Sequence, residues 1–227
     1  MILVLFDCDG TLVDSQHGIV ETMARTFKEH GLPAPALAET RRIIGLSLAR
    51  AIAELLGEAD MAKADLMAET YKRHFFALRS EPDFQEPLFD GAREAVLRLA
   101  RHEHILIGMV TGKSRRGVDA VLSRHGLREA FQVVRTADDC PSKPHPAMVL
   151  ECCAETGIEP AATLVIGDTV FDMTMAVAAS AVPLGVGWGY HEAEELTEAG
   201  AYRVLNHFDE LADAVTTLQR ESCEHVA

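Results

Sequence analysis

Basic residues are scarce in this sequence. The 227 residues include 21 Lys and Arg against 35 Asp and Glu, a formal net charge of −14 at pH 7. Proteins that hold nucleic acid without sequence preference need clustered positive charge against the phosphates, and anionic membranes attract basic segments. The composition therefore predicts neither a nucleic-acid partner nor a membrane partner.

Long hydrophobic runs are also missing near the N-terminus. The longest early run, Ile2–Phe6, has no basic region before it, and Asp7 and Asp9 follow at once. A transmembrane helix needs about 20 apolar residues, and a signal peptide needs a basic start before about 7–15 of them. We therefore expect neither at this point.

Cysteines are few and irregularly spaced. There are five, an odd number, and none forms a C-x-x-C pair. Cys152 and Cys153 are adjacent, which is too close for the usual spacing of zinc ligands. We expect no disulfide framework, and a reducing cytoplasm as the setting.

The apolar residues that are present occur in short, unbroken runs that predict the strands of a buried parallel sheet. These runs are Ile2–Phe6, Ile105–Val110, Gln132–Arg135, Thr163–Ile166 and Leu184–Val186, with Tyr202–Leu205 as a weaker candidate. Pro183 stands just before the fifth run, where a proline can open a strand. Helical patterns lie between the runs, so we predict an α/β fold with a doubly wound, Rossmann-like parallel sheet, in which ligands bind beyond the carboxyl ends of the strands.

One segment, from residue 14 to about residue 89, interrupts the alternation of strands and helices. It contains no convincing strand but shows apolar stripes at helical spacing, which are Ile19-Met23-Phe27 and Met67-Tyr71-Phe75-Leu78. We predict an inserted helical domain of residues 14–85 on a core formed by residues 1–13 and 86–227.

A pair of carboxylates follows the first predicted strand. Residues two apart in an extended chain point the same way, so Asp7 and Asp9 emerge together about 6.5–7 Å apart. A calcium loop would need an Asp or Asn and a Gly where Thr11 and Leu12 stand. An acidic surface turn is the other alternative, but it has no need of a hydrophobic strand behind it. We therefore predict that this pair is functional.

A second acidic pair follows the strand predicted at Thr163–Ile166. Asp168 stands at the strand end, and Asp172 falls one helical turn later on the same face. Thr169 can act as a helix N-cap with Asp172 as its partner, in a variant of the capping box. Capping and a direct functional role therefore both remain open for Asp172.

Two further strand-end features can hold an anion. Thr111, Gly112 and Lys113 follow the strand Ile105–Val110, and their hydroxyl and amide groups suit an anion. Lys143 lies in a loop that two prolines restrict. By contrast, the glycine patterns at 45–49 and 185–189 fail the nucleophile-elbow and dinucleotide-binding spacings.

These motifs, in this order, resemble the four motifs of the haloacid dehalogenase superfamily. They are Asp7-x-Asp9-Gly10-Thr11, Thr111, Lys143 and Gly167-Asp168-x-x-x-Asp172. The resemblance spans nearly the whole chain, and the helical insert resembles the cap of that superfamily. The segments at 188–191, 194–196 and 199–201 resemble its phosphoglycolate phosphatase branch.

The resemblance implies a role for each residue. Asp7 would be the nucleophile, and Asp9 would act as general acid and then as general base. Mg²⁺ would be held by the side chains of Asp7 and Asp168 and the backbone carbonyl of Asp9, with Asp172 in support. The phosphoryl oxygens would be held by Thr111, the Gly112 amide and Lys143, while Lys113 could add a positive charge.

The expected function is a Mg²⁺-dependent phosphomonoester hydrolase that acts on a small phosphorylated metabolite through an aspartyl phosphate, with 2-phosphoglycolate as the candidate substrate. A sugar phosphomutase, which keeps both aspartates of the first motif, and an inactive phosphate-binding regulatory protein are the alternatives. Arg41, Arg42 and Arg50 are candidates to bind a substrate carboxylate, and the alternative for each of them is a solvated arginine on a helix face. We expect a monomer or a homodimer.

Overall fold

The computed structural model describes residues 1–57 and 60–224, and its description of side chains ends at residue 217. The strands are β1 (Ile2–Phe6), β2 (Ile105–Val110), β3 (Val133–Arg135), β4 (Thr163–Gly167), β5 (Val182–Val186) and β6 (Arg203–Leu205). The α-helices are α1 (Gln16–Glu29), α2 (Leu37–Arg42), α3 (Leu48–Leu56), α4 (Met61–Arg79), α5 (Ala92–Leu99), α6 (Arg115–Arg124), α7 (Ala147–Thr156), α8 (Val170–Ala178), α9 (Ala193–Glu198) and α10 (Leu211–Glu224). Short 3₁₀ turns are η1 (Arg128–Ala130), η2 (Pro160–Ala162) and η3 (Phe208–Glu210).

The sheet is entirely parallel, with the strand order β3-β2-β1-β4-β5-β6. Strand β1 is central, and the chain moves outward on one side through β2 and on the other through β4. Phe6, the last residue of β1, pairs in register with Met109 of β2 and Ile166 of β4. The three strands therefore end almost level at the switch point, where doubly wound sheets bind their ligands.

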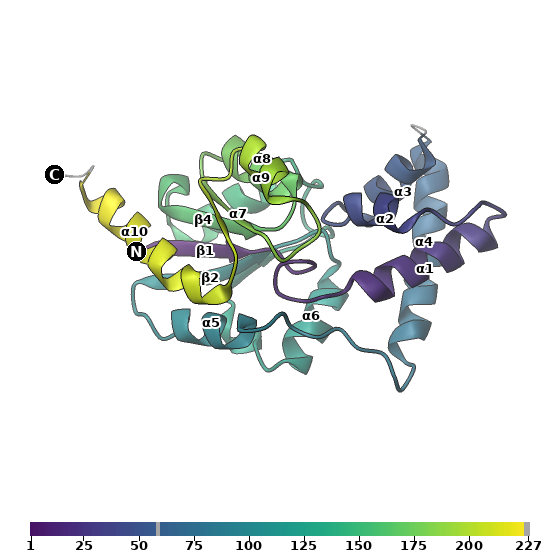
Figure 1. The fold of residues 1–227 in the computed structure, drawn as a ribbon, viewed down its shortest axis with the longest axis horizontal. Coiled ribbons are helices and arrows are strands. Elements are labelled where there is room, and N and C mark those ends of the chain that lie inside the picture. The colour runs from purple at the N-terminus through teal and green to yellow at the C-terminus, as the bar shows by residue number, and fades with distance from the viewer. Residues whose placement is uncertain (58–59, 225–227) are drawn as a thin grey trace.

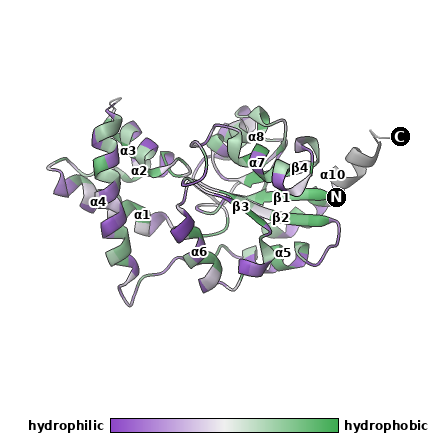
Figure 2. Cartoon of the chain, turned by 180° about the vertical axis from the view of Figure 1, so that it is seen from behind, coloured by the Kyte–Doolittle hydropathy of each residue, from purple (hydrophilic) through white to green (hydrophobic). Residues whose placement is uncertain are grey.

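Helices cover both faces of the sheet, which confirms the doubly wound α/β prediction. Ile2, Val4 and Phe6 of β1 belong to one apolar cluster with residues of α5, α6 and α10. Leu3 and Leu5 belong to a second cluster with residues of α7 and α8. Figure 1 shows these layers, and the central strands are hydrophobic along their length in Figure 2. Burial on both faces explains why the strands are unbroken apolar runs.

The expected start of β5 is wrong by two residues. The strand begins at Val182, so Pro183 lies inside it and pairs in register with Val165. A proline removes only its own N–H donor, and the carbonyl of Pro183 still accepts from the Tyr202 amide at 2.9 Å. The ladder therefore tolerates Pro183 near the start of the strand.

The helical insert forms a cap beside the carboxyl edge of the sheet (Figure 1). Helices α1 to α4 lie between β1 and α5, with an apolar cluster of their own. The two linkers to the core run side by side, because the Asp14 amide donates to Pro87 at 2.9 Å and the Phe89 amide to Leu12 at 3.0 Å. The cap is thus tied to the core by one short pair of antiparallel segments, and the exact domain boundaries stay a prediction.

The helices and the cysteines of the described residues bear on the expected absence of a membrane span and of disulfides. None of the helices in the described part of the chain has both the length and the hydropathy needed to cross a membrane. Cys8, Cys140, Cys152 and Cys153 are buried and free, whereas the side chain of Cys223 lies outside the described residues. The cellular compartment stays a prediction.

Candidate active site

Asp7 is the first residue beyond β1 and is completely buried. Its amide donates to the Ile166 carbonyl at 2.8 Å, which extends the ladder between β1 and β4. Its Oδ1 lies 2.8 Å from the Lys143 ammonium, and within the described part of the chain neither carboxylate oxygen meets a hydrogen-bond donor in good geometry. A buried carboxylate whose oxygens lack a well-placed hydrogen-bond donor is costly unless another ligand completes it.

Asp168 follows β4 and is held by groups from two loops. It accepts from the Thr11 hydroxyl at 2.8 Å and from the Tyr190 amide at 3.0 Å. A Cβ atom on Gly10 or on Gly189 would come within 2.1 Å of the Asp168 side chain, so only glycine leaves room for it at both positions. The glycine-rich segment after β5, which fails as a dinucleotide motif, therefore packs against this carboxylate.

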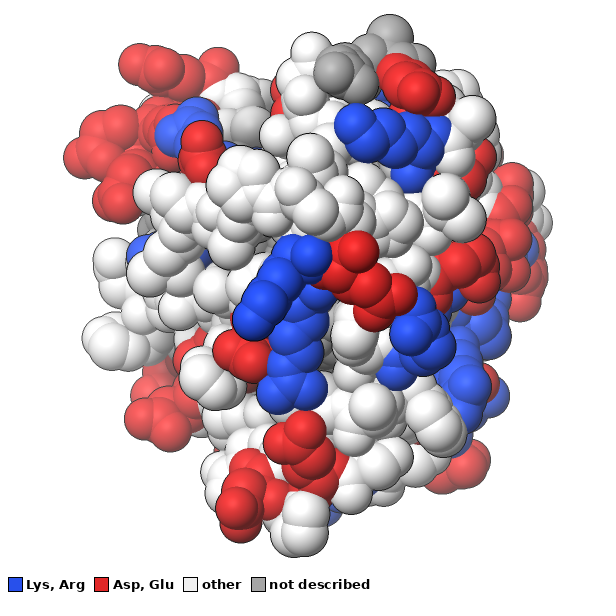
Figure 3. All heavy atoms as spheres, turned by 90° about the vertical axis from the view of Figure 1, so that its right-hand side faces the viewer, with Lys and Arg blue, Asp and Glu red and all other residues white. Residues whose placement is uncertain are grey.

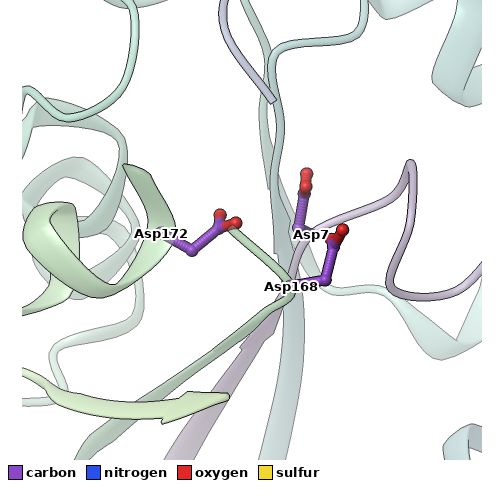
Figure 4. Close-up of side chains that lie close together, drawn as sticks. All are labelled: Asp7, Asp168 and Asp172. Atoms are coloured by element: carbon purple, nitrogen blue, oxygen red, sulfur yellow. The ribbon is translucent and has the colours of Figure 1, made fainter. Parts of the chain in front are cut away.

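Asp172 makes the capping contact that the sequence left open, while its direct functional role stays a prediction. Its Oδ2 accepts from the Thr169 amide at 3.1 Å and the Thr169 hydroxyl at 2.6 Å, which completes a capping box at the start of α8. Its Oδ1 accepts from Lys143 at 2.6 Å. The capping box at the start of α8 fixes the Asp172 carboxylate, which points toward Asp7 and Asp168 (Figure 4).

Asp7, Asp168 and Asp172 form one buried acidic cluster. Each offers an oxygen, and these oxygens lie within 4.8 Å of one another. Burial raises the pKa of Asp7 to about 7 against the opposing effect of Lys143, and it raises the pKa of Asp168 well above its ordinary value, with Asp7 and Asp172 adding to the rise.

The charges of this cluster fit a divalent cation. Three carboxylates and the Lys143 ammonium leave two negative charges in a buried space. Hard divalent cations prefer carboxylate oxygens, and neither oxygen of Asp7 has a hydrogen-bond donor in good geometry among the described residues. The predicted donor set of side chains therefore suits a hard divalent cation.

Asp9 lies apart from the acidic cluster. Its Oδ1 is 2.6 Å from the Lys113 ammonium, which is also 3.2 Å from Oε1 of Glu86. Lys113 is thus already paired with two carboxylates. Its contribution to phosphate binding remains a prediction. Glu86 was not predicted, because an acidic residue directly before Pro87 has the appearance of an ordinary linker residue.

The predicted phosphate loop lies directly under the cap. Thr111 is buried, and its hydroxyl oxygen accepts from the Lys113 amide at 3.2 Å, which leaves the hydroxyl hydrogen available to donate. A Cβ atom on Gly112 would lie 2.5 Å from the carbonyl oxygens of Gly45 and Leu46 in the cap. The cap loop therefore rests on the loop after β2.

The three cap arginines differ in their surroundings. Arg42 pairs with Glu195 of the core at 2.9 Å, and Arg50 faces Glu54 of its own helix at 3.7 Å. The Arg41 guanidinium lies 6.0 Å from the ring centre of Tyr190, and its buried Nε finds no hydrogen-bond partner among the described residues. On the face at the cap end, basic side chains stand beside acidic ones (Figure 3).

Comparison with known proteins agrees with this geometry. Residues 4–186 match the family model described as "Haloacid dehalogenase-like hydrolase". The chain is 30% identical over 228 residues to "Probable phosphatase IndB" of Dickeya dadantii (strain 3937), covering 99% of this chain and 98% of that protein. It is 32% identical over 216 residues to a phosphoglycolate phosphatase of Chromobacterium violaceum, covering 92% and 94%.

The fold has close counterparts among solved structures. A hydrolase from Pseudomonas syringae superposes with a TM-score of 0.83 at 25% identity, covering 96% of this chain and 99% of that one. The match to the family model extends from β1 to the end of β5 and thus includes both acidic pairs, Thr111 and Lys143. This chain therefore belongs to the haloacid dehalogenase-like hydrolases.

Proposed function

We propose that this hydrolase is a Mg²⁺-dependent phosphomonoesterase that transfers a phosphoryl group first to Asp7 and then to water. The observation that carries the proposal is the buried Asp7 carboxylate. It stands at the switch point with the Lys143 ammonium at 2.8 Å, and neither of its oxygens has a hydrogen-bond donor in good geometry among the described residues. The printed names of the relatives, a phosphoglycolate phosphatase and a probable phosphatase, support the reaction class.

In the first step, an oxygen of Asp7 attacks phosphorus, and the bond from phosphorus to the leaving oxygen breaks. Lys143, the Thr111 hydroxyl and the Gly112 amide hold the phosphoryl oxygens as negative charge builds on them. Asp9 gives its proton to the leaving oxygen, so that an alcohol departs.

The metal ion would be held by the side chains of Asp7 and Asp168 and by the backbone carbonyl of Asp9, with Asp172 in support. When bound, Mg²⁺ supplies positive charge to the phosphoryl oxygens and to the crowded carboxylates.

In the second step, Asp9 takes a proton from a water molecule that attacks the phosphorus of the aspartyl phosphate. The bond from phosphorus to Asp7 breaks, and both the free carboxylate and the protonated Asp9 are regenerated. The first step benefits from the exclusion of water and the second needs it, so the cap must open and close during turnover.

The reaction class is tested by phosphate release from p-nitrophenyl phosphate and from a panel of phosphorylated metabolites, with Mg²⁺, with Ca²⁺ and after exhaustive chelation. We expect turnover with Mg²⁺, loss on chelation, and no support from Ca²⁺, which takes more ligands in looser geometry. Full activity after chelation contradicts the metal requirement. Phosphate binding without release on the whole panel contradicts the hydrolase reaction, and interconversion of sugar phosphates without release indicates a mutase.

The proposed substrate is a small phosphorylated carboxylate such as 2-phosphoglycolate, with Arg41 as the partner of its carboxylate. The half-buried guanidinium with an open Nε beside Tyr190 favours Arg41 over Arg42 and Arg50, which have acidic partners. We expect Arg41→Ala to raise KM for 2-phosphoglycolate about 10-fold or more, the cost of a lost charged hydrogen bond. The KM for phenyl phosphate should change little.

Arg50→Ala is the matched control, because it removes a cap arginine whose partner is on its own helix. Equal effects of Arg41→Ala on both substrates, or a parent that ignores 2-phosphoglycolate, would refute this substrate while leaving the phosphatase proposal in place.

A further inference from the structure

A buried row of four charged side chains runs from Asp9 to the cap. The Lys113 ammonium lies 2.6 Å from Asp9 and 3.2 Å from Oε1 of Glu86, and Arg79 donates to Oε2 of Glu86. The Glu86 side chain is 1% exposed, and those of Lys113 and Asp9 are 8% and 11% exposed. Two cations and two carboxylates alternate, so the row is neutral as a whole. The two negative charges balance the two positive charges, and loss of either carboxylate leaves one positive charge unbalanced.

Glu86 stands where the cap joins the core. It directly precedes Pro87, whose carbonyl accepts from the Asp14 amide and pins the two linkers together. The Glu86 carbonyl accepts from His125 Nε2 of the core at 2.9 Å. The backbone of Glu86 is thus anchored to the core, while its carboxylate lies between Lys113 of the core and Arg79 of the cap.

The cap contributes the other side of the same contact. Arg79 is the last residue of α4, and the Phe75 ring of that helix lies 5.5 Å from the Arg79 guanidinium. The same ring lies 5.8 Å from the Lys113 ammonium. Lys113 therefore sits between the core loop that carries it, the linker and a helix of the cap.

A lysine side chain has four rotatable bonds and a point charge, so one contact does not fix it. Here the ammonium contacts two carboxylates, through a hydrogen bond to Asp9 at 2.6 Å and an ion pair with Glu86 at 3.2 Å. Without the Glu86 charge, the ammonium keeps Asp9 and the Phe75 ring as partners, and the Asp9–Lys113 pair can shift together.

From this arrangement we propose that Glu86 is a positioning residue that holds the Lys113 ammonium against Asp9 and so fixes the direction of the Asp9 carboxylate, with Arg79 linking this arrangement to the cap. The inference rests on the proposed function, in which Asp9 protonates the leaving oxygen. Misplacement of a catalytic group by about 1 Å can cost about 100-fold in rate.

The test uses Glu86→Gln, which keeps the shape of the side chain and removes its charge. The value of kcat/KM covers every step up to departure of the leaving group, so it includes the step in which Asp9 donates and leaves out the later hydrolysis of the aspartyl phosphate. An alkyl alcohol needs that proton, whereas p-nitrophenolate leaves without it. We expect kcat/KM to fall about 10- to 100-fold on an alkyl phosphate and less than about 3-fold on p-nitrophenyl phosphate.

A double variant tests whether Glu86 acts through Lys113. In a Lys113→Met background, Glu86→Gln should change the ratio of the two kcat/KM values by less than about 2-fold, since the side chain through which it acts is gone. Glu29→Gln is the matched control, because Glu29 accepts from Arg73 of the same helix α4 at 2.6 Å but lies on the exposed side of the cap. It should leave both substrates unaffected.

Equal losses on both substrates indicate a merely structural role and overturn the proposal, as does an undiminished effect of Glu86→Gln in the Lys113→Met background. If Glu86→Gln does not fold, Glu86→Asp is the test, because it keeps the charge but shortens the side chain. A loss of kcat/KM on the alkyl phosphate alone supports the proposal, and an unchanged ratio of the two kcat/KM values refutes it. A parent enzyme without phosphatase activity refutes the proposed function instead.

Discussion

At the scale of single residues, the site depends on carboxylates that are expensive to bury. Burial raises the pKa of Asp7 to about 7, although a nucleophile must be ionised. Lys143 opposes this effect from 2.8 Å, and a bound cation would oppose it further. Asp7, the proposed nucleophile, therefore needs its positive partners in place to be ionised.

Asp7→Asn should remove turnover and leave the fold intact. The amide has the same shape but cannot attack phosphorus, and losses for removal of a nucleophile are on the order of 10⁴- to 10⁶-fold in kcat. The measurement is kcat on p-nitrophenyl phosphate, with near-ultraviolet circular dichroism as the check on folding. Asp14→Asn, an exposed aspartate close by in the linker, is the control and should match the parent. Substantial turnover by purified Asp7→Asn would rule out the nucleophile assignment.

Residues at strand ends were predictable from the sequence, and Glu86 was not. Asp7, Thr111 and Asp168 each follow an apolar run, and parallel strands bring such positions to one edge. Glu86 reaches the site only because two linkers far apart in sequence pair with each other. Arg41 could be chosen among the cap arginines only after the partners of the other two were visible.

At the scale of elements, apolar runs located all six strands, because burial on both faces leaves few polar residues within them. The capping box at the start of α8 was also foreseen, since it depends on two residues three apart. The predicted start of β5 was wrong. The loss of stability that a proline causes in a strand depends on which neighbour its missing N–H would face, and a single sequence does not contain that information.

The loop after β3 offers a prediction about pH. Burial raises the pKa of Asp139, but hydrogen bonds from Thr136 and the charge of Arg115 outweigh it and leave the pKa below its ordinary value. A lowered folded pKa stabilises the protein above the unfolded value of about 3.9 and stops doing so as pH falls through the folded pKa. Asp139→Asn should therefore cost about 1 kcal/mol at pH 7, and less below about pH 4.

Urea denaturation of the parent and of Asp139→Asn between pH 7 and pH 3 measures this difference. Asp90→Asn, an exposed aspartate in the loop before α5, is the control. A cost for Asp139→Asn that stays constant or grows toward pH 3 would contradict the assigned sign.

At the scale of the whole molecule, the acidic cluster joins segments that are distant in the chain. Asp7 follows β1, Asp168 follows β4 and Asp172 belongs to α8, while Lys143 comes from the loop after β3. The mutual repulsion of the three carboxylates opposes folding of the core around them. An ion that binds the folded state relieves this repulsion, so global stability should report on metal binding even without substrate.

Mg²⁺ should therefore raise the Tm of the chelated protein. At 100 times its dissociation constant, a ligand adds about 2.7 kcal/mol, which for a chain of this size corresponds to about 5–10 °C. Asp168→Asn should lose most of this shift, because the amide offers the ion no negative charge. The fold should be kept, since the amide can still donate to Thr11 and accept from Tyr190. It should also melt above the parent when both are chelated, since one of three buried negative charges is gone. Calorimetry at constant ionic strength, with NaCl replacing MgCl₂, measures both effects, and an equal Mg²⁺ response in the parent and in Asp168→Asn would place the metal elsewhere.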